Sequence, residues 1–189
     1  MSSSHNKDPR REKIKSLIRT IPDYPAKGIQ FRDISTLLAD KEGLALVADL
    51  FYEQYKDAKI DLVVGIEARG FILGALLAYR IGAGFVMVRK EGKMPVGNGV
   101  ETIKESYQME YRSATTIEMH TDSIKPGQRV IIIDDLLATG GTLLAAAKLV
   151  ERLGGTIVEL SCIVELPDLG GRSKLAGYPL YHMVEFEGD

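Results

Sequence analysis

Short apolar runs alternate with helical patterns along most of this chain, and this alternation constrains the fold most strongly. Runs with the composition of strands buried on both faces occur at Ile60–Ile66, Phe85–Val88, Arg129–Ile133 and Thr156–Glu165. Between the first two of these, Phe71–Arg80 has the pattern of a helix. Strands that alternate with helices predict an α/β fold with a mainly parallel central sheet flanked by helices.

Other segments extend this pattern in both directions. A helix is expected over residues 9–21, ended by Pro22 and Pro25, and another begins after Asp40. A loop separates these two helices. Later helices are expected over Gly141–Leu153 and Gly171–Leu175, with strands over Ser106–Tyr111 and Thr115–His120, which form an edge hairpin, and over Leu180–Phe186.

Composition narrows the class of protein. The 189 residues are 45% hydrophobic and 26% charged, which suits one folded domain over residues 10–189 behind a flexible tail, residues 1–9. A net charge of −2 argues against broad nucleic-acid binding. No signal peptide and no membrane-spanning run is visible, and the single cysteine, Cys162, lies in an apolar run as a buried thiol would. We therefore expect a cytoplasmic protein with no nucleic-acid or membrane partner.

The most informative segment runs from Val130 to Thr142, where a buried strand leads through a turn of small residues into a helix. The start of a helix offers unpaired N–H groups and the positive end of the helix dipole, and both attract phosphate. Gly140 and Gly141 allow close approach of the backbone, while the hydroxyl of Thr139 can donate to phosphate oxygens. These residues predict a phosphate site.

Two carboxylates, Asp134 and Asp135, stand at the end of the strand in the same segment. They do not suit the phosphate itself, because like charges repel. They suit hydroxyl groups, which donate to carboxylates, or a hydrated Mg²⁺. The segment has neither the Walker A pattern nor the glycine pattern of dinucleotide-binding turns. The combination predicts a site for a phosphorylated sugar such as ribose 5-phosphate.

Polar, glycine-containing turns follow three of the expected strands, after Ile66, Val88 and Ile133. Ligands bind outside the carboxyl ends of strands in parallel sheets, so these turns converge on one site. The second turn opens a long polar loop, residues 89–105, and loops of this length are usually functional. Its basic residues are Arg89, Lys90, Lys93 and Lys104.

The stretch Asp-Asp-Leu-Leu-Ala-Thr-Gly-Gly-Thr, from Asp134 to Thr142, resembles the phosphoribosyl pyrophosphate (PRPP) motif of type I phosphoribosyltransferases. It is closest to the variant found in adenine phosphoribosyltransferases, and the resemblance covers about residues 10–187. The resemblance implies the type I phosphoribosyltransferase fold, with a small hood from the N-terminal segment and a mobile hairpin loop. It also implies transfer of the 5-phosphoribosyl group from PRPP to adenine, giving AMP and pyrophosphate, in purine salvage. Mg²⁺ would be bound through PRPP, without a dedicated protein cage, and the enzyme would be a homodimer.

The resemblance also assigns roles to individual residues. The phosphate would be bound by Ala138, Thr139, Gly140, Gly141 and Thr142, and the ribose and Mg²⁺ by Asp134 and Asp135. Phe31 would stack on the purine, with Gln30 and Arg32 near its edge. Glu110 would be the acid or base near the purine nitrogen, and Tyr111 would close over the reaction centre. The pyrophosphate would be bound by Arg69, Arg89, Lys90 and Lys93.

Two alternative functions stay open from the residues alone. The first is the same scaffold with another purine: xanthine, guanine or hypoxanthine. Gln30 stands where other members often carry an apolar residue, and Pro95–Met109 is longer than in the vertebrate enzymes. The second is a regulator that senses PRPP, but such proteins carry an added DNA-binding domain, and Glu110 and Lys93 favour catalysis.

Overall fold

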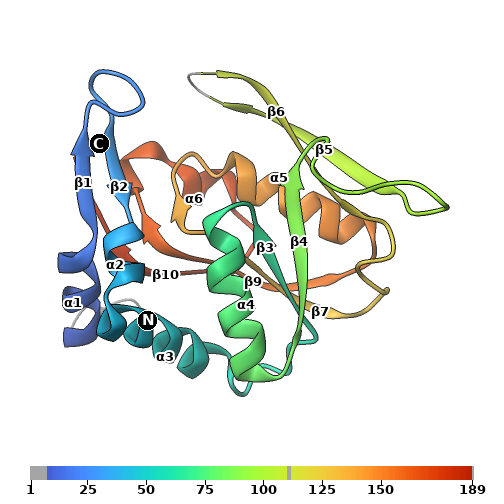
Figure 1. Ribbon diagram of the computed structural model, residues 1–189, viewed down its shortest axis with the longest axis horizontal. Coiled ribbons are helices and arrows are strands. Elements are labelled where there is room, and N and C mark those ends of the chain that lie inside the picture. Colours follow the sequence, from blue (N-terminus) through green and yellow to red (C-terminus); the bar gives the residue numbers. More distant parts are fainter. Residues whose placement is uncertain (1–7, 110–111, 189) are drawn as a thin grey trace.

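The computed structural model describes residues 8–109 and 112–188, which form an α/β fold around one large sheet (Figure 1). The parallel strands are β3 (Leu62–Ile66), β4 (Gly84–Lys90), β7 (Arg129–Ile133), β9 (Thr156–Glu165) and β10 (Leu180–Glu185). At one edge, the antiparallel hairpin of β5 (Thr102–Met109) and β6 (Arg112–His120) is added through β4. The order is β10-β9-β7-β3-β4-β6-β5, so the predicted mainly parallel sheet is confirmed.

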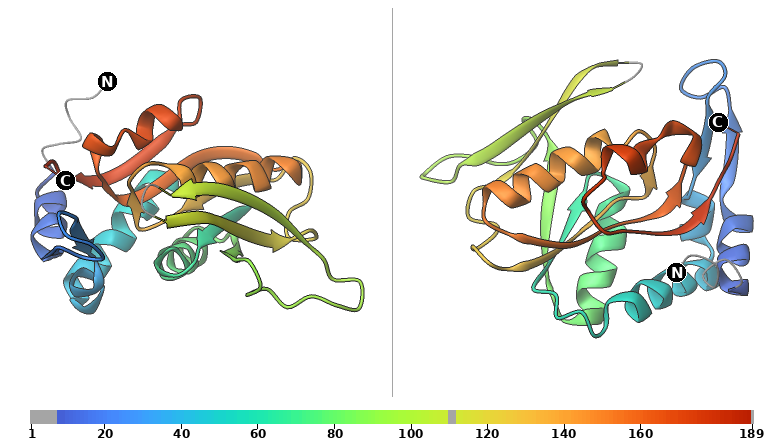
Figure 2. Two further views of the ribbon diagram at one scale, coloured as in Figure 1. Left: turned by 90° about the horizontal axis from the view of Figure 1, so that it is seen from above. Right: turned by 180° about the vertical axis from the view of Figure 1, so that it is seen from behind.

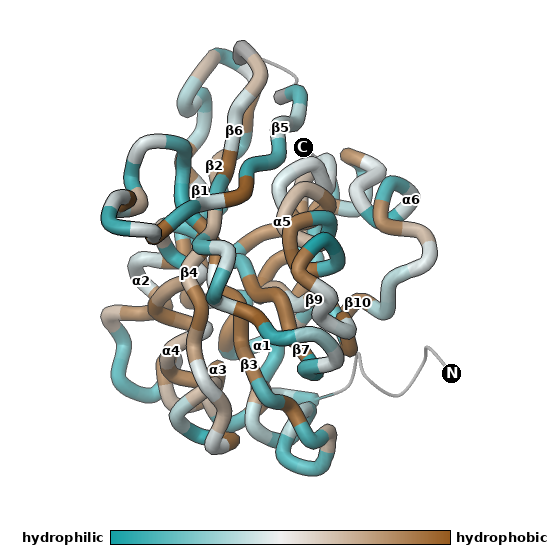
Figure 3. Tube along the Cα trace, turned by 90° about the vertical axis from the view of Figure 1, so that its right-hand side faces the viewer, coloured by the Kyte–Doolittle hydropathy of each residue, from teal (hydrophilic) through white to brown (hydrophobic). Residues whose placement is uncertain are grey.

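Helices cover both faces of the sheet. α3 (Lys41–Tyr55) and α4 (Arg69–Ile81) lie on one face, while α5 (Gly141–Arg152) lies on the other (Figures 1 and 2). Successive side chains of a strand point to opposite faces of the sheet and so pack against different helices. Val63 packs in the same core cluster as Leu73 of α4, whereas Val64 packs with Leu143 of α5. Figure 3 shows the resulting concentration of hydrophobic residues in the central strands.

The N-terminal segment forms the expected hood, but with a shorter helix than predicted. α1 (Pro9–Leu17) begins after the Asp8 side chain, which caps it, and Arg19–Pro22 is a strand, β1. β1 pairs antiparallel with β2 (Gln30–Asp33), which the sequence placed in a loop. The predicted helix over residues 9–21 is therefore wrong after Leu17. Ile14 and Ile18 are both buried at helical spacing, but β1 obtains its backbone partners from β2, across residues 23–29, and helical periodicity does not reveal this pairing.

The long basic loop is also shorter than expected. Arg89 and Lys90 still belong to β4 and pair with β6, and β5 already begins at Thr102. The irregular part is thus residues 91–101, and the prediction of a loop over 89–105 is wrong at both ends. β6 supplies backbone hydrogen-bond partners to β4 on one side and to β5 on the other. These residues are therefore extended, although their polar, glycine-rich composition is typical of a loop.

Several smaller elements connect the sheet to the site. α2 (Ser35–Ala39) leads into α3, where the carboxylate of Asp40 accepts a 2.7 Å hydrogen bond from the Gly43 amide, as expected of a cap. β8 (Leu136–Leu137), inside the expected turn, pairs with the end of β9. A short 3-10 turn (Pro167–Leu169) and α6 (Gly171–Lys174) join β9 to β10.

Two further expectations concern the chain as a whole. Cys162 is fully buried as a free thiol, as predicted. Among the described residues, no helix has the length and apolar character needed to cross a membrane.

Candidate active site

A cavity of about 800 Å³ lies at the carboxyl ends of the parallel strands. The hood and the β5–β6 hairpin both project beyond this edge of the sheet (Figure 1). The cavity is lined by the hood from Pro25 to Arg32, by Arg69 of α4, by Tyr107 and Gln108 of β5, and by the segment from Asp135 to Leu143. The structure therefore brings together segments that the sequence singled out separately.

The predicted phosphate cradle is the turn from β7 into α5. Gly140 caps the helix with φ at 78°, a backbone conformation that favours glycine. A Cβ there would lie 2.9 Å from the Gly171 carbonyl oxygen, and one on Gly141 would lie 2.9 Å from the Tyr107 ring. Both positions thus require the absence of a side chain. The lining includes every residue predicted for the phosphate: Ala138, Thr139, Gly140, Gly141 and Thr142.

The paired acids lie against the start of α4. A Cβ on Gly70 would be 2.7 Å from the Ile133 carbonyl oxygen, so α4 packs directly on the end of β7. This approach lets Arg69 donate a 2.6 Å hydrogen bond to the Asp135 carboxylate. Burial first, and the charge of Asp135 second, raise the pKa of Asp134 well above its usual range. A hydroxyl donor or a cation bound beside Asp134 would favour its ionised form.

The expected base platform, Phe31, lines the cavity from the hood. Tyr24 meets its ring edge-on, with the ring centroids 5.2 Å apart, and the guanidinium carbon of Arg69 lies 5.4 Å from its centroid. Gln30 and Arg32 line the same cavity. Arg32 is oriented by a 2.8 Å hydrogen bond to the Thr20 hydroxyl across the β1–β2 pair. A flat base can therefore be bound within the same cavity as a sugar phosphate.

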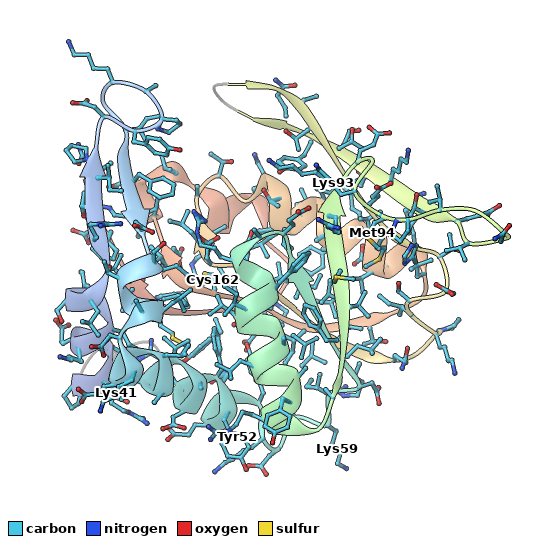
Figure 4. The ribbon with its side chains drawn as sticks, in the orientation of Figure 1. Lys41, Tyr52, Lys59, Lys93, Met94 and Cys162 are labelled. Atoms are coloured by element: carbon cyan, nitrogen blue, oxygen red, sulfur yellow. The ribbon has the colours of Figure 1, made fainter. Side chains whose placement is uncertain are left out.

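The other predicted pyrophosphate residues lie outside the lining, at the end of β4. Arg89 donates two hydrogen bonds, of 2.8 and 3.2 Å, to the carboxylate of Glu67. The same contact lowers the pKa of Glu67. Lys90 and Lys93 are exposed, and Figure 4 shows Lys93 beside Met94 at the C-terminal end of β4. Of the predicted pyrophosphate residues, only Arg69 lines the cavity.

The predicted catalytic pair follows β5 directly in the sequence. Glu110 and Tyr111 lie outside the described residues, between β5 and β6. Their neighbours Tyr107 and Gln108, to which the sequence assigned no role, line the cavity. The Tyr107 ring packs against Gly141, which is distant along the chain. Sequence patterns do not reveal such a contact, so the only sequence signal for Tyr107 was its place in the hairpin segment.

A second group of titratable side chains lies at the ends of β9 and β10. Ligand atoms of Glu165, His182 and Glu185 lie within 4.8 Å of one another. Arg172 is ion-paired with Glu165 and is 3.0 Å from the His182 ring, so a cation already occupies this environment. None of these side chains lines the cavity, and the sequence assigned His182 no role.

Residues 33–177 match the family described as phosphoribosyl transferase domain. The chain belongs to the phosphoribosyltransferase family. An adenine phosphoribosyltransferase of Chlorobium chlorochromatii is 54% identical over 180 residues, covering 93% of this chain and 99% of the relative. The crystal structure of an adenine phosphoribosyltransferase from Rhodothermus marinus is 47% identical in sequence, with a TM-score of 0.87. The match covers 94% of this chain and 99% of the Rhodothermus chain. The resemblance to adenine phosphoribosyltransferases is thus confirmed.

A third relative extends the fold similarity to a ligand complex. An adenine phosphoribosyltransferase of Trypanosoma brucei, solved with AMP, pyrophosphate and ribose-5-phosphate, is 27% identical with a TM-score of 0.85. The match covers 98% of this chain and 82% of the relative. The type I phosphoribosyltransferase fold predicted from the motif is therefore confirmed by structures both near and distant in sequence.

Proposed function

We propose that this phosphoribosyltransferase transfers the 5-phosphoribosyl group from PRPP to adenine, giving AMP and pyrophosphate, in purine salvage. The observation that carries the proposal is the single cavity that contains both the phosphate cradle at Gly140 and the aromatic platform at Phe31. One end suits a sugar phosphate and the other suits a flat base. The curated relatives that cover nearly the whole chain carry the name of this activity.

The cradle anchors the substrate. The amides at the start of α5 and the hydroxyls of Thr139 and Thr142 bind the 5-phosphate, which the helix dipole also favours. Asp134 and Asp135 accept hydrogen bonds from the ribose hydroxyls. They also lie where positive charge develops on the ribose ring as pyrophosphate leaves, and a preorganised carboxylate there lowers the barrier.

Phe31 binds the base by stacking, and Gln30 and Arg32 contact its edge. Glu110 moves a proton at the purine nitrogen, and Tyr111 covers the reaction centre. Tyr107 and Gln108, which line the cavity from β5, help the hairpin to exclude water. Exclusion of water matters because the cationic ribose intermediate would otherwise be hydrolysed.

Arg69, Arg89, Lys90 and Lys93 face the leaving group. Arg69 reaches it from inside the cavity, and the other three reach it from the end of β4. In this structure Arg69 is paired with Asp135 and Arg89 with Glu67, so both arginines exchange a carboxylate for phosphate oxygens when substrate binds. Such an exchange keeps each guanidinium paired with an anion.

Asp134 and Asp135 would help to hold a Mg²⁺ ion that is bound mainly by PRPP. The carboxylate oxygens of Asp134 and Asp135 are hard ligands that fit Mg²⁺, but Asp135 is already paired with Arg69. The residues present therefore suit an ion bound mostly by substrate oxygens, without a dedicated protein cage. When bound, the ion would supply positive charge that stabilises the departing pyrophosphate.

The enzyme is a homodimer in the cytoplasm under the same proposal. Ile72 and Tyr79 of α4 are 51% and 85% exposed, and lie seven positions apart on one helix face. Met87 of the neighbouring β4 is 43% exposed. Exposed apolar groups on adjacent elements are typical of association surfaces. Light scattering should give the mass of a dimer for the natural chain and of a monomer for Tyr79→Glu, whereas a natural monomer would contradict the proposal.

The decisive experiment compares bases. Purified protein is incubated with PRPP and Mg²⁺ and with adenine, hypoxanthine, guanine or xanthine in turn, and nucleotide formation is followed. AMP formation from adenine, with much lower turnover of the other bases, is expected. Turnover of another purine but not of adenine would favour the alternative specificity, and PRPP binding without any turnover would favour a regulator.

A further inference from the structure

Glu118, on β6, is buried yet charged, and it has no part in the site described so far. The residue is 2% exposed, and its carboxylate faces the basic segment that follows β4. One oxygen accepts hydrogen bonds from the amides of Gly92, at 2.8 Å, and Met94, at 3.2 Å. The other accepts one from the hydroxyl of Thr102, at 3.1 Å. A buried carboxylate requires such partners, because burial of an unpaired charge is costly.

These contacts bracket Lys93. The two amides that donate to Glu118 belong to the residues immediately before and after it. The side chain of Met94 is also buried, at 6% exposed, so the backbone here is held by both a polar and an apolar contact. Lys93 itself remains exposed, at the C-terminal end of β4 (Figure 4).

The backbone of Lys93 also contacts a second cation, Arg89. The carbonyl oxygen of Lys93 accepts a 3.0 Å hydrogen bond from the guanidinium of Arg89. Arg89 is also bound by Glu67, so it is oriented from two directions. A displacement of the backbone at Lys93 would therefore move one candidate pyrophosphate residue directly and loosen another.

The hydrogen bonds to Glu118 are of the strong, charge-assisted kind. Burial alone would raise the pKa of Glu118, but the hydrogen bonds from Met94, Thr102 and Gly92 outweigh it and lower the pKa. The side chain is thus an anion at neutral pH. Hydrogen bonds to an ionised acceptor are roughly twice as strong as neutral ones, so this carboxylate restrains residues 92–94 effectively.

We propose that Glu118 is a positioning residue for the pyrophosphate half of the reaction, fixing the backbone on both sides of Lys93 so that Lys93 and Arg89 face the leaving group. It acts through these two residues and does not touch substrate. The proposal rests on the proposed function, since it assumes that the cations at the end of β4 bind pyrophosphate.

Kinetics of three variants test the proposal. Glu118→Leu removes every hydrogen bond, whereas Glu118→Gln keeps one accepting oxygen and replaces the other with a donor that the Thr102 hydroxyl can accept. Glu101→Leu, an exposed glutamate of the same region, is the matched control. We expect Glu118→Leu to raise the KM for PRPP and the inhibition constant of pyrophosphate about tenfold, with the KM for adenine nearly unchanged. Glu118→Gln should recover most of the difference.

A second measurement does not depend on activity. Trypsin cleaves after lysine, so the rate of cleavage at Lys90 and Lys93 reports how firmly the segment is held. Glu118→Leu should be cleaved there faster than Glu101→Leu, and pyrophosphate with Mg²⁺ should protect the natural chain more than the Glu118→Leu variant. If Glu118→Leu fails to fold, Thr102→Val removes only one contact and should show smaller changes in the same direction.

Several outcomes would overturn the proposal. One is a folded Glu118→Leu with an unchanged KM for PRPP and unchanged cleavage. Another is a parallel rise of both KM values together with a lower melting temperature, which would indicate general destabilisation. If the natural chain makes no AMP from adenine, the proposed function fails by itself. Unchanged cleavage of Glu118→Leu would then overturn the positioning role separately.

Discussion

The guanidinium of Arg69 lies over the ring of Phe31, with its central carbon 5.4 Å from the ring centroid. The same guanidinium donates a 2.6 Å hydrogen bond to Asp135. One side chain therefore links the hood, which carries the proposed base platform, to the acids proposed to bind the ribose. The contact couples the two halves of the cavity, and an adenine ring that stacks on this face of Phe31 must displace Arg69.

Arg69→Lys tests this coupling. Lysine keeps the charge but lacks the planar fork that contacts both Phe31 and Asp135. We expect kcat/KM for PRPP to fall by about ten- to a hundredfold, because a charge-assisted hydrogen bond contributes ~1.5–3 kcal/mol. Arg80→Lys is the control, since Arg80 of the same helix pairs with Asp49 on the surface. Steady-state kinetics with both substrates would contradict the coupling if the two variants behaved alike.

Phe31→Leu tests the base platform. Leucine keeps an apolar side chain but offers no flat face, and stacking contributes ~1–3 kcal/mol, so the KM for adenine should rise about tenfold or more. The KM for PRPP should change less, because the cradle lies at the other end of the cavity and Phe31 reaches the acids only through Arg69. Phe31→Tyr retains a ring and should stay close to the natural enzyme. An unchanged KM for adenine in Phe31→Leu would remove Phe31 from the base site.

Gly140→Ala tests the cradle. The residue has φ at 78°, and the added Cβ would lie 2.9 Å from the Gly171 carbonyl oxygen. We expect a loss of ~1–3 kcal/mol in the free energy of unfolding, together with weaker PRPP binding. Gly99→Ala is a matched control, because its φ is 84° but no atom lies within 4 Å of the added Cβ. Gly99→Ala adds only the backbone strain of a positive φ, whereas Gly140→Ala adds a steric clash as well. Thermal melts and calorimetric titration with PRPP should therefore show a larger loss for Gly140→Ala.

The pH dependence of stability should reveal Glu165. Burial alone would raise its pKa, but hydrogen bonds from His182 and Arg172 outweigh it and lower the pKa to about 2. A lowered pKa stabilises the folded state fully above the unfolded value of ~4.3, and this stabilisation is lost as the pH falls towards 2. The free energy of unfolding should fall by ~1–2 kcal/mol, a reduced figure because solvent screens the exposed Arg172. Denaturant titrations at pH 7 and pH 3 should show a smaller difference for Glu165→Gln; an equal difference would contradict this assignment.

Local patterns explain why the turn between β7 and α5 was predictable. The strand, the two acids and the glycine turn are contiguous from Val130 to Thr142, and each step follows from burial, charge or backbone freedom. The structure places the predicted turn at the start of α5 and within the cavity. The division into a tail and one domain, and the roles of the individual site residues, remain predictions.

Non-local contacts explain what the sequence missed. β1 and β2 obtain their partners across a loop, so the register from Arg19 with Asp33 to Pro22 with Gln30 leaves no periodic signal. The ion pair between Arg89 and Glu67 joins the ends of two parallel strands, and Glu118 reaches Gly92 from a third. Such contacts depend on strand order, which periodicity does not encode.

The sequence by itself determined the fold class, the family and the glycine turn between β7 and α5, because burial pattern, glycine placement and paired acids act over a few neighbouring residues. Only the tertiary structure decided how Arg69 joins Phe31 of the hood to Asp135, and how the buried carboxylate of Glu118 contacts the residues on both sides of Lys93. These relationships arise where distant segments pack within a few ångströms, and their geometry depends on the register and crossing of whole elements.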